Sequence, residues 1–173
     1  MTLFFLSALF ITNIWAQDPA ATKEEFEAAY AQRIKKDYLN GVYIPVDLAE
    51  AFSELNRLID AEAKQKLKSV SEEEAAHKLH FSFGRWMMVN WAFYEGSRFT
   101  AYLRQIGVTH PDDMAQFVII SYHRYLNKKP LEVKERVAIY QENRKKELEA
   151  RKRQGTIIHS ETRQLQPKGD KSN

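Results

Sequence analysis

The chain has 173 residues and a formal net charge of +3, and 44% of its residues are apolar, which suits one domain with a hydrophobic core. It contains no cysteine, which excludes disulfide bonds, thiol nucleophiles and cysteine-bound zinc. Only 6 glycines and 5 prolines interrupt it, and this scarcity of breakers favours long helices over a β-sandwich with many turns.

The positive charge is concentrated near the C-terminus. From Val133 to the end, eleven Lys and Arg oppose six Asp and Glu, a net charge of +5, whereas the rest of the chain carries 15 against 17, or −2. A near-neutral body with a basic arm argues against nucleic-acid binding, and we expect no nucleic-acid partner. The arm could touch anionic surfaces such as lipid headgroups, although its interleaved glutamates favour a solvated helix.

The first sixteen residues, MTLFFLSALFITNIWA, are apolar and uncharged. This run suits the core of a secretory signal peptide and is shorter than the roughly 20 residues of a membrane-spanning helix. Ala16 is a small residue of the kind found just before a cleavage site. The bulky Ile14 and the lack of Lys or Arg near the start depart from the usual signal-peptide pattern, and a buried N-terminal helix is the alternative interpretation. We expect a signal peptide cleaved near Ala16, no transmembrane segment in the mature chain, and a periplasmic or secreted protein.

The N-terminal half predicts three helices. Aromatic and apolar residues at every fourth position predict a helix over residues 20–39, which Asn40-Gly41 ends. Residues 42–46 are expected to be extended, because Pro45 disfavours helical angles at the residue before it. Asp47, with Glu50 as its reciprocal partner, should cap a second helix, and a short third helix is expected over residues 61–67.

Capping signals also mark the remaining helices. Ser71 and Glu74 form a capping box for a helix that starts at residue 72, and Gly84 within it either breaks the helix or lets a neighbour approach closely. Ser97 should cap a short helix that stops at Gly107. A helix from His110-Pro111-Asp112-Asp113 to Asn127 and a final helix over residues 131–153 should follow.

Together these elements predict an all-α protein, a compact bundle of about five to seven helices with a disordered basic C-terminal tail. The predicted organisation, in chain order, is a signal peptide (1–16), an N-terminal helix (17–43), a core helical domain (44–130), a basic helix (131–153) and the tail (154–173).

Residues 44–130 also carry an unusual series of motifs, namely IPVDLAEAF, SEEE, LHFSFGRWMMVNWAFYEGSRF and HPDDM followed by SYHRYL. The series resembles a bacterial domain family of unknown function whose members share an LHFxxGxWxxxNW core and a following HPDDM and SYHRYL segment. The resemblance covers about half of the chain and is specific, because rare residues recur in order. It implies a small bacterial helical domain and brings no catalytic residues with it.

One candidate metal site lies at the start of the helix from residue 72. Glu73, His77 and His80 are four and three residues apart, which places them on one helix face. Glu74 and His77 have the Glu-x-x-His spacing of di-iron bundles, but the chain has no second such pair. Glutamates in a first helical turn are also ordinary helix-dipole residues, so the structural interpretation is favoured over metal binding.

A candidate binding surface is the polar and aromatic segment from Trp86 to Arg98, together with the helix from Pro111. Aromatic residues at helical spacing usually form a core, and a buried Asn beside Trp needs hydrogen-bond partners, so the segment is either core or a ligand surface. Histidine beside carboxylates could form an acid–base pair. The residues assigned to binding are Arg85, Trp86, Asn90, Trp91, Ser97, Arg98, His110, Asp113 and His123.

No phosphate-binding loop or dinucleotide motif is present in the sequence, and we expect no cofactor. The leading hypothesis is an exported, non-enzymatic binding or interaction domain with an unknown protein or small-molecule partner. The alternatives are a small hydrolase that uses His80, His110 or His123 with a nearby carboxylate, and a metal-binding protein that uses Glu73, His77 and His80.

Overall fold

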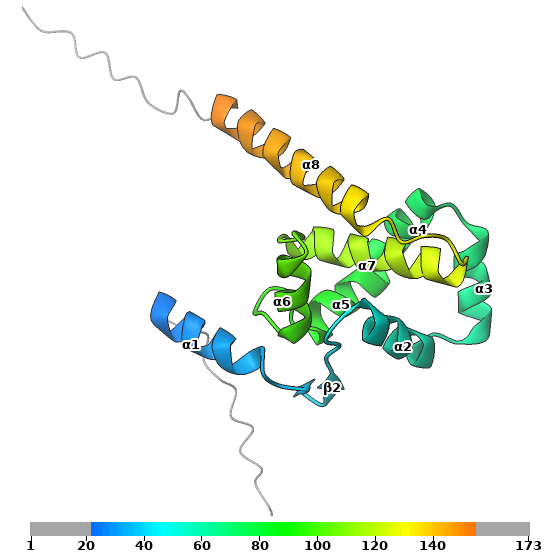
Figure 1. The fold of residues 1–173 in the computed structure, drawn as a ribbon, viewed down its shortest axis with the longest axis horizontal. Helices are drawn as coiled ribbons and strands as arrows, with labels where there is room; N and C mark the ends of the chain where they lie inside the picture. Colours follow the sequence, from blue (N-terminus) through cyan, green and yellow to red (C-terminus); the bar gives the residue numbers. More distant parts are fainter. Residues whose placement is uncertain (1–21, 155–173) are drawn as a thin grey trace, which may run out of the picture.

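The computed structural model describes residues 22–154 (Figure 1). The predicted signal peptide and the tail beyond residue 154 lie outside the described residues. Within them, the all-α class is confirmed, with one small hairpin as the β-structure. The elements are α1 Lys23–Arg33, β1 Tyr38–Leu39, β2 Val42–Tyr43, α2 Leu48–Leu58, α3 Ala61–Ser69, α4 Glu72–Leu79, the π-helix η1 His80–Gly84, α5 Arg85–Asn90, α6 Arg98–Gln105, α7 Pro111–Leu126 and α8 Val133–Gln154.

Helix α7 is the centre of the body. It packs against α2, α3, α4, η1, α5 and α8, and its residues from Met114 to Arg124 are buried except for Gln116. In Figure 1 it crosses the middle of the molecule, while α8 starts beside it and runs outward. The outer part of α8 is exposed, so only its first three turns belong to the core. None of the helices in residues 22–154 is long and apolar enough to span a membrane.

The predicted N-cap residues are confirmed, although the Glu74 side chain of the predicted Ser71 capping box pairs with Lys78 instead. The side chains of Asp47, Ser71 and Ser97 each accept a hydrogen bond from the backbone N–H three residues on, and His110 accepts one from Asp112. These bonds satisfy N–H groups that have no partner inside the helix, which is why short polar side chains mark helix starts so well.

The prediction of a helix over residues 20–39 is wrong at its C-terminal end. Helix α1 ends at Arg33, and β1 pairs with β2 in an antiparallel hairpin with Tyr38 opposite Tyr43. Asn40 and Gly41 have φ values of 49° and 79°, the left-handed pair that a tight two-residue hairpin turn needs. The Asn-Gly pair is therefore a hairpin turn rather than a helix stop.

Gly84 does not break its helix. Helices α4, η1 and α5 follow one another without a gap and can be counted as one helix. Residues 22–154 then contain seven helices, the upper end of the predicted five to seven. Gly84 is buried, and a β-carbon there would lie 3.5 Å from Cδ1 of Ile119 and 3.6 Å from Cβ of Ala115. These are ordinary van der Waals distances, so η1 packs closely on α7 without a strict need for glycine.

Glu50 fastens the hairpin to α2. Its carboxylate accepts hydrogen bonds from the hydroxyl of Tyr43 at 2.7 Å and from the backbone N–H of Val46 at 3.0 Å, so it does not make the predicted reciprocal bond to Asp47. The Tyr43 hydrogen bond, followed by that of Val46, lowers the pKa of Glu50 below its ordinary value. The Glu50 carboxylate thus links β2 and the segment that follows it to α2.

We expect Glu50→Gln to change the pH dependence of stability. Because the folded state lowers the pKa of Glu50, the carboxylate stabilises the fold above the ordinary glutamate pKa of about 4.3, and this contribution is lost as the pH falls through the lower folded value. Glutamine keeps an acceptor for Tyr43 but cannot ionise. Urea denaturation should show the wild-type advantage over Glu50→Gln at neutral pH and its loss in acid; a pH-independent difference would contradict this origin.

Candidate functional site

A groove of about 500 Å³ lies between α4 and η1 on one side, the first turns of α7 at its base, and α8 on the other side. We call it the α4–α8 groove. Its lining brings together side chains from three separate sequence segments, residues 72–81, 112–120 and 136–143. The polar and aromatic residues that line it are Glu72, Glu73, His77, His80, Phe81, Asp112, Asp113, Gln116, Arg136, Tyr140 and Asn143.

His80 and Asp112 face each other in this groove. His80 Nε2 lies 3.7 Å from Asp112 Oδ1, and His110 Nδ1 lies 3.5 Å from the other carboxylate oxygen. Asp112 is in the first turn of α7, where the helix dipole favours an ionised carboxylate. His80 is the first residue of η1, and π-helical turns inside α-helices occur frequently at functional sites. The pair is therefore both accessible and held by rigid elements.

Two of the four acidic residues in the groove are already neutralised. Arg144 binds both oxygens of Asp113 at 2.6 Å, and this pairing raises the pKa of the guanidinium above its ordinary value. Glu72 is paired with arginines from two other helices. In contrast, the Glu73 side chain has no ion pair within residues 22–154, and Asp112 has only histidine neighbours. The uncompensated negative charge of the groove is that of Glu73 and Asp112.

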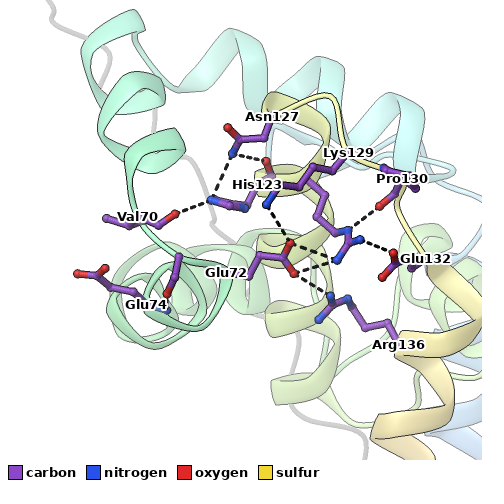
Figure 2. A network of polar contacts seen from close by, with 11 residues as sticks. Val70, Glu72, Glu74, His123, Asn127, Lys129, Pro130, Glu132 and Arg136 are labelled. Carbon is purple, nitrogen blue, oxygen red and sulfur yellow. Dashed lines mark hydrogen bonds and ion pairs between the residues drawn. The ribbon is translucent and has the colours of Figure 1, made fainter.

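Glu72 fixes the distance between the walls of the groove (Figure 2). Its carboxylate accepts hydrogen bonds from Nη1 of Arg124 on α7 at 3.0 and 3.1 Å and from Nη2 of Arg136 on α8 at 2.9 Å. Arg124 also donates to the Pro130 carbonyl and pairs with Glu132, which holds the loop that leads into α8. The network ties α4, α7 and α8 together at one end of the groove.

Apolar side chains border the polar lining. Phe81 of η1 is 78% exposed and Ile139 of α8 is 56% exposed, although both are large apolar residues. The ring of Phe81 stands edge-on to that of His80, with 5.2 Å between centroids. Tyr140 is buried beneath them, and burial raises its pKa. The groove therefore offers both negative charge and unburied apolar surface.

The three residues of the predicted metal site all line the α4–α8 groove. Even so, within residues 22–154 no group of three or more His, Asp and Glu side chains is arranged to hold a metal ion. His77 is exposed on α4, whereas His80 turns toward Asp112 on α7. The structure therefore places these three residues along an open groove.

The predicted binding segment from Trp86 to Arg98 is mostly core. Trp91 is 1% exposed, and its carbonyl accepts a hydrogen bond from the buried Ser97 hydroxyl at 2.7 Å. Asn90 donates to the Trp86 carbonyl within its own helix. Arg98 donates to the Ile44 carbonyl at 2.6 Å and pairs with Asp37, which fastens the hairpin to the body.

The other predicted binding residues are divided between the groove and the rest of the molecule. Asp113 lies in the groove, and His110 lies beside it, with Nδ1 3.1 Å from Nη2 of Arg144. His123 is buried elsewhere on α7, with Nε2 2.9 Å from the Val70 carbonyl, and is shown in Figure 2. Arg85 is exposed and Trp86 is half-buried. His80 and His110 thus share Asp112 as a neighbour, whereas His123 lies apart from both.

The described residues therefore form a small helical domain whose open groove has both polar and apolar lining residues. Residues 44–126 match a domain family described only as a domain of unknown function (DUF6794), which confirms that this part of the chain resembles a family without an assigned function. The match includes α2 to α7, and therefore two walls of the groove, but neither the hairpin nor α8. No curated protein matches the chain, and no solved structure does.

Proposed function

We propose that the protein is an exported, non-enzymatic binding domain whose α4–α8 groove takes a peptide segment with a Lys or Arg beside an apolar side chain. The observation that carries this proposal is the pair of uncompensated carboxylates, Glu73 and Asp112, in a groove bordered by the exposed Phe81 and Ile139. Export rests on the apolar first sixteen residues, and a mature N-terminus at Gln17, read by mass spectrometry, would support it.

The charge of the groove favours a cationic partner. An ammonium about 4 Å from one carboxylate gains roughly 1 kcal/mol in bulk water and about 4 kcal/mol near a protein surface, whereas an anion is repelled by similar amounts. Covering a phenylalanine such as Phe81 with an apolar side chain contributes about 1.5–3 kcal/mol when burial is complete. A peptide segment supplies both groups at once, and grooves between helices are a common site of peptide recognition.

The residues around His80 favour a binding function over a hydrolytic one. The His80–Asp112 pair resembles a histidine oriented by a carboxylate, which supports the hydrolase alternative. However, no serine or threonine is among the described residues that line the α4–α8 groove, so the pair has no serine or threonine hydroxyl to activate, and the hydroxyl of Tyr140 belongs to a buried side chain. A binding role needs only the charges and apolar surface that the groove already contains.

The proposal predicts that the mature chain binds a fluorescein-labelled peptide of alternating leucine and lysine more than tenfold more tightly than one of alternating leucine and glutamate. Fluorescence anisotropy gives both dissociation constants. Phe81→Ala should weaken binding of the leucine–lysine peptide, whereas Val89→Ala, which removes a side chain that is 67% exposed outside the groove, should not. Equal affinity for both peptides, or equal effects of both variants, would contradict the proposal.

A further inference from the structure

A second, smaller pocket lies on another part of the molecule, between the hairpin, α2 and Trp86. It has a volume of about 370 Å³, near the low end for small-molecule sites, and we call it the hairpin pocket. The hairpin lies between α1 and α2 at the edge of the body in Figure 1. The lining of the hairpin pocket includes the side chains of Tyr38, Tyr43, Glu54, Arg57 and Trp86.

Tyr38 is exposed in a way that the fold does not require. Its side chain is 61% exposed, and its ring meets only that of Tyr43, edge-on, with 5.4 Å between centroids. The Asn40-Gly41 turn sets the hairpin register, which places the backbone of Tyr38 directly opposite Tyr43. An aromatic ring fixed at the mouth of a pocket is a preformed platform for a ligand.

Trp86 supplies the second aromatic wall. It is half-buried and stacks on Phe83 with an angle of 9° between the ring planes, while its edge packs against Trp91. These neighbours restrict the orientation of the indole. The rings of Tyr38 and Trp86 thus form two aromatic walls of the pocket, which Tyr43 and Trp91 also line.

Glu54 and Arg57, the charged residues that line the hairpin pocket, bind each other but keep further hydrogen-bonding capacity. Glu54 accepts hydrogen bonds from Nε and Nη2 of Arg57 through one oxygen only, Oε2. Within residues 22–154 this leaves Oε1 of Glu54 and Nη1 of Arg57 without a hydrogen-bond partner. The pair therefore presents one acceptor and one donor group side by side at the edge of the aromatic surface.

The opposite charges of Glu54 and Arg57 make the hairpin pocket less suited to an ionic ligand than to a neutral one. A cation attracted by Glu54 is repelled by Arg57, and an anion is repelled by Glu54, so the pair has no net preference. One cation–π face is already occupied, since the guanidinium of Arg98 lies over the Tyr43 ring at 5.0 Å. What remains is a neutral ligand with an apolar face and hydroxyl groups along its edge.

From these observations we infer that the hairpin pocket binds a neutral saccharide unit. The C–H face of a pyranose ring would lie against Tyr38 and Trp86, while its hydroxyls would donate to Glu54 and accept from Arg57. This function is independent of the α4–α8 groove, because the two sites share no lining residue.

Tryptophan fluorescence of the full mature chain tests the inference, since Trp86 lines the pocket. The probes are cellotriose, chitotriose and maltotriose, with tetramethylammonium chloride and sodium sulfate as ionic comparisons. We expect at least one trisaccharide to give a saturable change that neither salt reproduces. Tyr38→Ala should weaken its binding at least tenfold, Tyr38→Phe should retain it, and Glu54→Gln should weaken it severalfold.

Tyr94→Ala is the matched control, because Tyr94 is 57% exposed and lies outside the hairpin pocket. It should leave saccharide affinity within twofold of wild type, and circular dichroism should show that all variants fold. The inference is overturned if no trisaccharide gives a saturable change, if folded Tyr38→Ala and Tyr94→Ala bind alike, or if tetramethylammonium binds as tightly as the best saccharide.

Discussion

Glu72→Ala is expected to lower the free energy of unfolding by about 3 kcal/mol or more. The variant leaves the largely buried guanidinium of Arg136 without its carboxylate partner, while Arg124 keeps only Glu132 and the Pro130 carbonyl. Removing one partner of a buried ion pair typically costs about 3–5 kcal/mol, because the remaining charge is neither paired nor hydrated. Urea denaturation followed by circular dichroism measures the difference.

Glu74→Ala is the control for this prediction. Glu74 lies two residues further along α4 and, among the described residues, pairs with the exposed Lys78, an interaction that solvent screening makes weak. Both substitutions place the same residue in the first turn of the same helix, so helix propensity cancels to first order. Similar losses in the two variants would mean that the Glu72 network does not hold α4, α7 and α8 together.

Trp91→Ala is expected to destabilise the fold by about 3–5 kcal/mol, the usual cost of removing a large buried ring. Trp91 packs against the rings of Trp86, Phe93 and Phe99, with centroid distances of 5.2 to 6.4 Å. Its removal leaves a cavity at the point where α5 turns into α6. Thermal unfolding should show a large fall in the midpoint temperature.

Tyr94→Ala, three residues further on, should change the stability by no more than about 0.5 kcal/mol, because Tyr94 is exposed. If Trp91→Ala were as stable as Tyr94→Ala, Trp91 would not be a core residue. The surface interpretation of the segment from Trp86 to Arg98 would then regain support.

Local signals predicted most of the helices. Asp47, Ser71, Ser97 and His110 each satisfy backbone N–H groups within three residues, so their effect is visible in a short stretch of sequence. The error at residues 34–39 arose because Tyr38 continues a four-residue spacing, whereas the Asn-Gly turn that follows specifies a hairpin. Turn chemistry overrode periodicity at this point.

The groove was harder to predict, because its geometry depends on tertiary packing. His80 and Asp112 were both candidates, but they are brought together only by the packing of η1 on α7. Glu72 was not among the residues that the sequence marked as candidates. Its pairing with Arg124 and Arg136 joins residues more than fifty positions apart, and no local signal in the sequence indicates it.

We propose that the uncompensated carboxylates of the α4–α8 groove, Glu73 and Asp112, bind a cationic peptide. The most direct test compares the affinity of the leucine–lysine peptide for two double variants of equal charge. Glu73→Gln with Asp112→Asn removes the two groove carboxylates, whereas Glu62→Gln with Glu142→Gln removes two exposed carboxylates from local helical pairs elsewhere. We predict a loss of at least tenfold, about 1.4 kcal/mol, in the first variant and less than twofold in the second. Equal losses in both would contradict the claim, because attraction would then come from overall charge and not from the groove.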